Sequence, residues 1–208
     1  PQYTLHATIK NAFNTEKKVL KHVFRLHGMD YMVGTESQNT YNIIPAPRSL
    51  EKGQGKFAFN KETRIILKDK NAEAPLRFLT DRLTRTAQLP LKVQNSAQKH
   101  SGNYVIFDRA NDSALGNEGY KINISPEYIQ VLANKEAGFF YAIQSLLQLL
   151  PAEIYSNTTV YKDSWSIPAA NITDTPQFEH RGLHLDVGRH LYPVPFIKKY
   201  IDLMSMQK

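Results

Sequence analysis

The sequence predicts an α+β domain followed by a strand and a helix of the kind that begins a (β/α)8 barrel. Short strand patterns and two helix patterns alternate irregularly between residues 41 and 150. An alternating strand pattern at 181–187 then runs into a polar tip and a helix pattern. We therefore predict three parts: an unassigned N-terminal segment and linker at 1–40, an antiparallel-rich α+β domain with its connector at 41–177, and the start of a barrel at 178–208.

The first 40 residues show no sustained hydrophobic period. Glu16 to Leu26 predicts a short basic helix, and Val33 to Thr40 is typical of a linker. His22 and His27 are five residues apart, which does not place them on one helical face. A solvated helix is therefore favoured over a metal site.

The strand signals of the α+β domain are short and bounded by turn residues. A strand at 42–44 ends at Pro45, and Gly53 to Gly55 predicts a turn. Further strands are predicted at 56–59, 63–67, 91–93 and 104–107, a hairpin at 119–133, and another edge strand at 164–172.

Two helices are predicted between these strands. The first opens at Asn71 or Ala72, carries Pro75 in its first turn and ends at Pro90. The second covers 137–150 and ends at Pro151. Because it is apolar almost all round, we expect it to be buried against the sheet.

Composition narrows the function classes. The 208 residues contain no Cys, which excludes disulfides, thiolate zinc sites and Cys nucleophiles. The net charge of +7 is spread along the chain with acids among the bases, so nucleic-acid binding is not predicted. No apolar run approaches the roughly 20 residues of a membrane span. The oligomeric state stays open.

Polar residues gather where the strand at 181–187 ends. Arg189 and His190 lie past its C-terminal tip, where an Arg can donate paired hydrogen bonds to carboxylates, phosphates or vicinal sugar hydroxyls. Asp186 either orients this Arg or forms an internal salt bridge with it. His180 and His184 lack the Glu of a helical zinc motif and sit on a strand, so no metal site is predicted.

The run Arg181-Gly-Leu-His-Leu-Asp-Val-Gly-Arg-His190, followed by Pro193 and 197–204, resembles the opening of the catalytic TIM (β/α)8 barrel of family 20 glycoside hydrolases, the β-N-acetylhexosaminidases. Upstream, 43–47, 118–120 and 137–146 resemble parts of that family's accessory domain. The resemblance covers about residues 41–208.

The resemblance implies a function. Such enzymes release terminal β-linked N-acetylhexosamine with retention, and the substrate's acetamido oxygen acts as the nucleophile. The Asp-Glu pair that assists lies on a later barrel strand, so no catalytic residue is expected in these 208 residues, and the chain alone is expected to be inactive. The expected partner is an N-acetylhexosamine-terminated glycan, and no cofactor is implied. A bacterial source would imply a periplasmic, secreted or surface-attached protein.

The resemblance also implies roles for particular residues. Arg189 matches the Arg that binds the hydroxyls of the terminal sugar, with Asp186 and His190 as supports. Arg181, at the opposite end of the strand, is interpreted as structural. The alternative is a non-catalytic carbohydrate-binding or scaffolding module built on 41–150, although the sequence there shows no aromatic platform for sugar. We also expect apolar side chains of 178–208 to be exposed: Leu183, Leu185, Val187, Phe196, Ile197, Ile201 and Leu203.

Overall fold

The computed structural model describes residues 3–7, 20–24, 41–95 and 102–208, and the chain divides into two compact units, 1–38 and 39–208. In the first unit β1 (Tyr3–Ala7) pairs antiparallel with β2 (Leu20–Phe24). The predicted helix is therefore wrong over residues 20–24. A short isolated helix is marginal in water, whereas strand pairing satisfies the backbone groups of both segments. The predicted linker at 33–40 and His27 lie outside the described residues.

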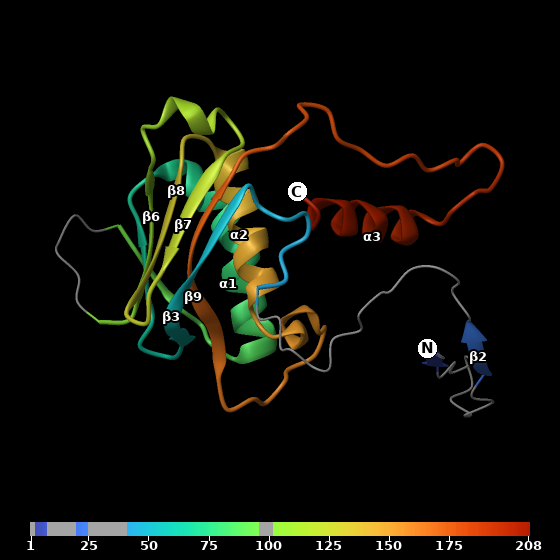
Figure 1. Ribbon diagram of the computed structural model, residues 1–208, viewed down its shortest axis with the longest axis horizontal. Coiled ribbons are helices and arrows are strands. Elements are labelled where there is room, and N and C mark those ends of the chain that lie inside the picture. Colours follow the sequence, from blue (N-terminus) through green and yellow to red (C-terminus); the bar gives the residue numbers. More distant parts are fainter. Residues whose placement is uncertain (1–2, 8–19, 25–40, 96–101) are drawn as a thin grey trace. The chain divides into compact units, whose positions relative to one another are not determined.

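The second unit is a seven-stranded mixed sheet with two helices, α1 (Glu73–Ala87) and α2 (Glu136–Leu149), side by side on one face (Figure 1). The strand order is β3-β9-β7-β8-β6-β4-β5. The strands are β3 (Ser49–Phe59), β4 (Arg64–Leu67), β5 (Lys92–Gln94), β6 (Tyr104–Arg109), β7 (Tyr120–Ile124), β8 (Tyr128–Ala133) and β9 (Trp165–Asp174). Short 3₁₀ turns occupy Lys70–Ala72, Ser113–Leu115 and Ala152–Tyr155.

The sheet contains both antiparallel and parallel pairs, and a helical crossover joins one of the parallel pairs. The pairs β3–β9, β9–β7 and β7–β8 are antiparallel. The pairs β8–β6, β6–β4 and β4–β5 are parallel. Parallel neighbours need a long connection, and α1 supplies it between β4 and β5. The predicted hairpin is confirmed as β7 and β8, and the predicted strands at 56–59, 63–67, 91–93 and 104–107 fall on β3 to β6.

Both predicted helices are confirmed. α1 carries Pro75 in its first turn and ends at Ala87, and the next residue, Gln88, has left-handed backbone angles. On α2 the side chains of Phe139, Ile143 and Leu146 are completely buried, and the helix packs on β7 and β8 as its apolar pattern predicts.

Three predictions about the strands are wrong, because they depend on contacts with residues far away in the sequence. Gly53 to Gly55 lies inside β3, where a bulge between Lys52 and Lys56 accommodates the glycines. β9 is not an edge strand, because β3 and β7 flank it. Residues 42–44 form no strand: the Gln148 side chain accepts from Ile44 N at 2.6 Å and donates to Ile44 O at 3.0 Å, which occupies both backbone groups.

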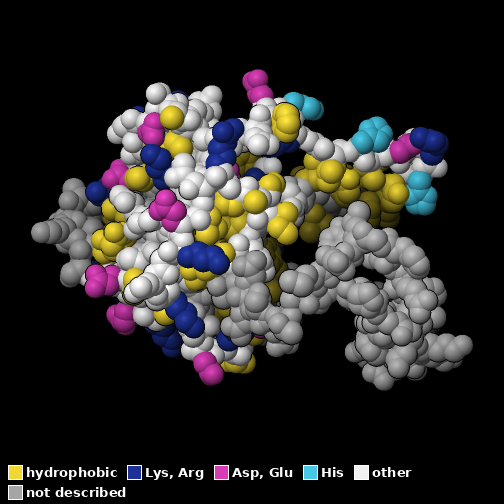
Figure 2. Space-filling model, viewed as in Figure 1, with side chains coloured by type: hydrophobic (Ala, Val, Ile, Leu, Met, Phe, Trp, Pro, Cys, Tyr) yellow, Lys and Arg dark blue, Asp and Glu magenta, His cyan; other side chains and the backbone are white. Residues whose placement is uncertain are grey.

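Residues 178–193 run as an extended loop, and α3 (Val194–Ser205) follows as predicted (Figure 1). The predicted strand at 181–187 is not formed, because no described strand pairs with it. Hydrophobic side chains gather over α3 (Figure 2). Leu183 is 63% exposed, Ile201 57% and Leu203 50%. Val187 and Phe196 are also exposed, whereas Leu185 and Ile197 are half-buried.

Among the described residues, no helix is both long and apolar enough to span a bilayer.

Candidate functional site

Asp186 and Arg189 are joined in a tight turn of the extended loop. Asp186 Oδ2 accepts from Arg189 Nε at 2.5 Å. Asp186 Oδ1 accepts from the backbone N–H groups of Gly188 at 3.0 Å and Arg189 at 3.1 Å. The backbone N–H of Arg189, and next its side chain, hold the pKa of the Asp186 carboxyl below its usual value. The carboxylate therefore fixes both the turn and one edge of the guanidinium.

Arg189 presents its remaining donors to solvent. Its side chain is 93% exposed. A guanidinium has five N–H donors, and Asp186 takes the one on Nε. Within the described part of the chain, no hydrogen bond involves the two Nη groups of Arg189, so their N–H donors point to solvent without a partner in this segment.

Among the described residues, His190 forms no hydrogen bond with the Asp186–Arg189 pair; its ring packs at the end of a row of three aromatic side chains. Its ring meets Tyr192 edge-on at 4.5 Å, Tyr192 stacks on Phe196 at 4.6 Å, and Phe196 stacks on Tyr200 at 6.3 Å. The structure thus brings two of the three predicted site residues together. The roles of Arg189, Asp186 and His190 toward a sugar stay predictions.

A second polar site forms where α2 meets the loop, and two glycines shape it. A Cβ on Gly138 would lie 2.5 Å from Gly119 O, and a Cβ on Gly119 would lie 2.4 Å from Leu115 O. Only residues without a side chain allow this approach of α2 to the start of β7. The approach places Glu118 beside Tyr141, whose hydroxyl lies 3.5 Å from Glu118 Oε1.

Arg181 fits between Glu118 and Tyr141. Its Nη1 donates to Glu118 Oε2 at 3.1 Å and its Nη2 to Tyr141 OH at 3.1 Å, and its guanidinium lies 5.5 Å from the centre of the Tyr141 ring. The hydrogen bond to Glu118 raises the pKa of Arg181. These contacts agree with the interpretation of Arg181 as structural.

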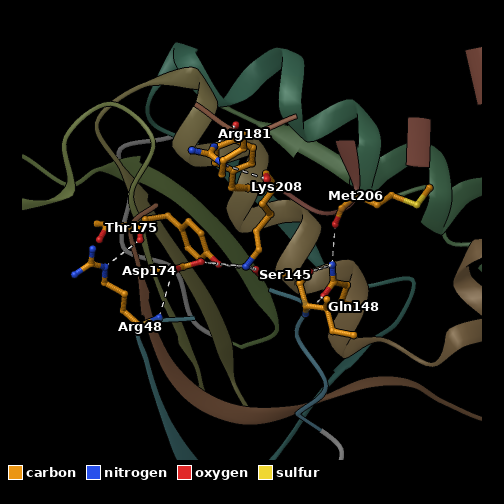
Figure 3. A network of polar contacts seen from close by, with 11 residues as sticks. Arg48, Ser145, Gln148, Asp174, Thr175, Arg181, Met206 and Lys208 are labelled. Atoms are coloured by element: carbon orange, nitrogen blue, oxygen red, sulfur yellow. Dashed lines mark hydrogen bonds and ion pairs between the residues drawn. The ribbon is translucent and has the colours of Figure 1, made fainter. Parts of the chain in front are cut away.

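Lys208 reaches a buried cluster beside β7 and β9 (Figure 3). Its three ammonium N–H groups meet three acceptors, Asp174 Oδ2 at 3.0 Å, Tyr120 OH at 3.1 Å and Ser145 Oγ at 3.3 Å. Burial lowers the pKa of Lys208, and the charge of Asp174 opposes that shift. Burial, and next the charge of Asp174, raise the pKa of the Tyr120 phenol.

The described residues contain no group of three His, Asp or Glu side chains that could hold a metal ion.

Comparison with known proteins identifies the family. Residues 40–175 match glycosyl hydrolase family 20, domain 2, and residues 178–208 match the glycosyl hydrolase family 20 catalytic domain. This chain belongs to glycosyl hydrolase family 20. The α+β domain is its accessory domain, and the loop with α3 is the start of its catalytic barrel.

Curated relatives extend well beyond the matched region. A β-hexosaminidase of Porphyromonas gingivalis is 34% identical over 80% of this chain and 21% of its own length. A β-hexosaminidase of Vibrio furnissii is 28% identical over 81% of this chain and 25% of its own length. The chain thus spans about a fifth to a quarter of these two relatives.

Solved family 20 structures share the fold. The β-N-acetylhexosaminidase of Streptomyces coelicolor has a TM-score of 0.71 and 30% identity over 81% of this chain and 33% of its own. The exo-β-N-acetylglucosaminidase of Vibrio harveyi, solved with N-acetylglucosamine, has a TM-score of 0.66 and 26% identity over 80% of this chain and 24% of its own.

Barrel membership explains the strand that is not formed at 181–187. A barrel strand is held by hydrogen bonds to a neighbour on each side. Residues 178–208 match the catalytic domain, and within them the described structure holds one helix and no strand that could pair with 181–187.

Sequence reasoning missed the polar cluster around α2. The sequence signal for it is a polar stripe, Tyr141, Ser145 and Gln148, on a largely apolar helix. Spacings of four and three residues place these side chains on one helical face.

Proposed function

We propose that this chain is the N-terminal part of a β-N-acetylhexosaminidase that hydrolyses terminal, non-reducing β-linked N-acetylhexosamine. The observation that carries the proposal is the order of the two matches, an accessory domain at 40–175 directly followed by the start of a catalytic domain at 178–208. The hexosaminidase names of the relatives and the N-acetylglucosamine bound in the Vibrio harveyi structure support the substrate class.

In this proposal Arg189 binds hydroxyls of the terminal sugar. Its exposed guanidinium offers paired donors, and Asp186 holds it in one orientation. A donor fixed in advance loses less entropy on binding than a freely rotating one. Asp186 is therefore a positioning residue.

The chemical step itself is assigned to residues outside these 208. The substrate-assisted mechanism uses the acetamido oxygen as nucleophile and needs a general acid for the leaving group. The sequence contains no adjacent Asp-Glu pair. The contribution of this chain is sugar binding and support of the first barrel unit.

The activity can be tested by joining the chain to a barrel. Residues 40–208 would replace the matching part of the Porphyromonas gingivalis β-hexosaminidase, and hydrolysis of an aryl N-acetyl-β-glucosaminide would be followed. The chimera is expected to turn over and the 208-residue chain alone is not. A folded but inactive chimera, or turnover by the pure chain, would contradict the proposal.

A carbohydrate-binding module is the second candidate, and one observation favours it. Tyr104 and Tyr128 stack at 5.6 Å with 14° between their rings. They are paired across β6 and β8 next to Val105 and Ile129, which face the core, so they lie on the sheet face opposite α1 and α2. The sequence predicted no aromatic platform for sugar in this domain, and this stacked pair is the feature that supports the second candidate. Titration of the chain with chitobiose, compared with a Tyr128→Ala variant, tests this candidate: loss of specific binding in the variant supports it, and no binding by the parent excludes it.

A further inference from the structure

The polar stripe of α2 contacts the loop and α3 at separate points. Tyr141 accepts from Arg181, Ser145 from Lys208, and Gln148 Nε2 donates to Met206 O at 2.8 Å. Figure 3 shows Ser145 and Gln148 directed at the residues that follow α3. Every member of the stripe thus has a partner in the catalytic-domain segment.

The two ends of this segment are also tied to each other. Arg181 Nε donates to Lys208 O at 3.4 Å, and its Nη1 donates to Phe178 O at 2.6 Å. Residues 182–205 leave the accessory domain and return to it between these contacts (Figure 1). The Asp186–Arg189 turn lies within this loop-and-helix segment, between its two points of attachment.

Apolar packing of α3 is limited. None of its residues is fully buried, and Ile197, Tyr200 and Met204 are half-buried. By contrast, the side chain of Lys208 is 7% exposed and that of its partner Asp174 is 16% exposed. An ion pair removed from water is screened far less than one on the surface. The attachment of the segment therefore depends on the polar contacts at its two ends.

We infer that the Tyr141–Ser145–Gln148 stripe is the surface on which the accessory domain fixes the start of the catalytic barrel, with Arg181 and Lys208 as two anchors. Attachment at one point leaves a segment free to pivot, whereas attachment at two points restricts its orientation. The accessory domain thereby sets where the Asp186–Arg189 turn lies. This inference does not require hydrolytic activity, because the contacts are measured by distance. A failed activity assay would therefore not contradict it.

The test measures the orientation of α3 in the 208-residue chain. Because the chain contains no Cys, Glu62→Cys and Lys199→Cys provide two unique spin-label sites, one in the exposed turn before β4 and one on α3. Pulsed electron spin resonance gives the distribution of the distance between the labels. The parent is expected to give one narrow distribution, and Arg181→Met, Lys208→Met and the double variant are expected to lose it.

Matched controls separate anchoring from loss of charge. Arg189→Met and Lys198→Met remove the same charges from exposed positions in the same segment and should keep the narrow distribution. Glu118→Gln keeps its side-chain shape while weakening the Arg181 anchor, so it tests the inference even where a larger change impairs folding. Circular dichroism establishes that each variant is folded. A broad distribution in the parent, or a narrow one in all anchor variants, would overturn the inference.

Discussion

Lys208 Nζ lies 3.0 Å from Asp174 Oδ2, and both side chains are nearly buried. Asp174 is the last residue of β9, and its other carboxylate oxygen accepts from Arg48 N at 3.3 Å. Tyr120 OH lies 3.0 Å from Asp174 Oδ2 as well. One carboxylate therefore links the start of β3, β7 and the segment after α3.

Asp174→Asn should lower the free energy of unfolding by about 1.5–3 kcal/mol, the range for a hydrogen bond to a charged group. Since Lys208 is the main charged partner, the effect should be clearly smaller in a Lys208→Met background. Urea unfolding of the two single variants and the double variant measures this coupling. Asp163→Asn, an exposed position, is the control. Full additivity of the two changes would contradict the ion pair.

Alkaline pH should destabilise the fold through Tyr120. Its pKa is raised by burial, so the folded phenol keeps its proton above pH 10.0, where the unfolded phenol loses it. The unfolded state then binds fewer protons, and stability falls as pH rises, by at most about 1.4 kcal/mol per pH unit.

The Tyr120→Phe variant separates this contribution from that of Tyr155, whose raised pKa is present in both proteins. Urea unfolding between about pH 9 and 11 should show a shallower loss for Tyr120→Phe than for the parent. Tyr161→Phe, at a residue 86% exposed, should behave as the parent. Equal slopes for all three proteins would refute the prediction.

Gly138→Ala should destabilise the accessory domain. The new Cβ would meet Gly119 O at 2.5 Å and Ala133 Cβ at 2.9 Å, and neither atom belongs to a flexible side chain. Overpacking of this kind costs about 1–3 kcal/mol, which matches or exceeds the roughly 1 kcal/mol that Ala gains over Gly in a helix. Thermal unfolding measures the change. Gly182→Ala meets nothing within 4 Å and should leave the melting temperature unchanged; a similar shift in both variants would count against close packing.

Local patterns predicted the parts of the fold that depend on neighbouring residues. The hairpin of β7 and β8 is readable because its alternation and its Ser-Pro turn are contiguous. β9 was predicted as a strand but not as an internal one, because its neighbour β3 lies more than 100 residues earlier. Residues 42–44 were predicted as a strand because nothing near them shows that Gln148 binds Ile44.

The same distinction applies to the two polar sites. Asp186 and Arg189 are three residues apart, so their pairing could be proposed from spacing alone, and the ion pair is present. The stripe Tyr141, Ser145 and Gln148 is visible on a helical wheel, but its partners Arg181, Met206 and Lys208 come from 40 to 63 residues later. Only the return of the chain to α2 reveals what the stripe contacts.

The most direct test of sugar binding by Arg189 is the kcat/KM of an Arg189→Ala variant of the chimera on an aryl N-acetyl-β-glucosaminide. Loss of a charged hydrogen bond to the sugar, at about 1.5–3 kcal/mol, corresponds to a decrease of roughly 10- to 150-fold. Lys198→Ala, an exposed charge on α3, is the matched control and should keep the parent value. A folded Arg189→Ala chimera with unchanged kcat/KM would contradict the sugar-binding role of this corner.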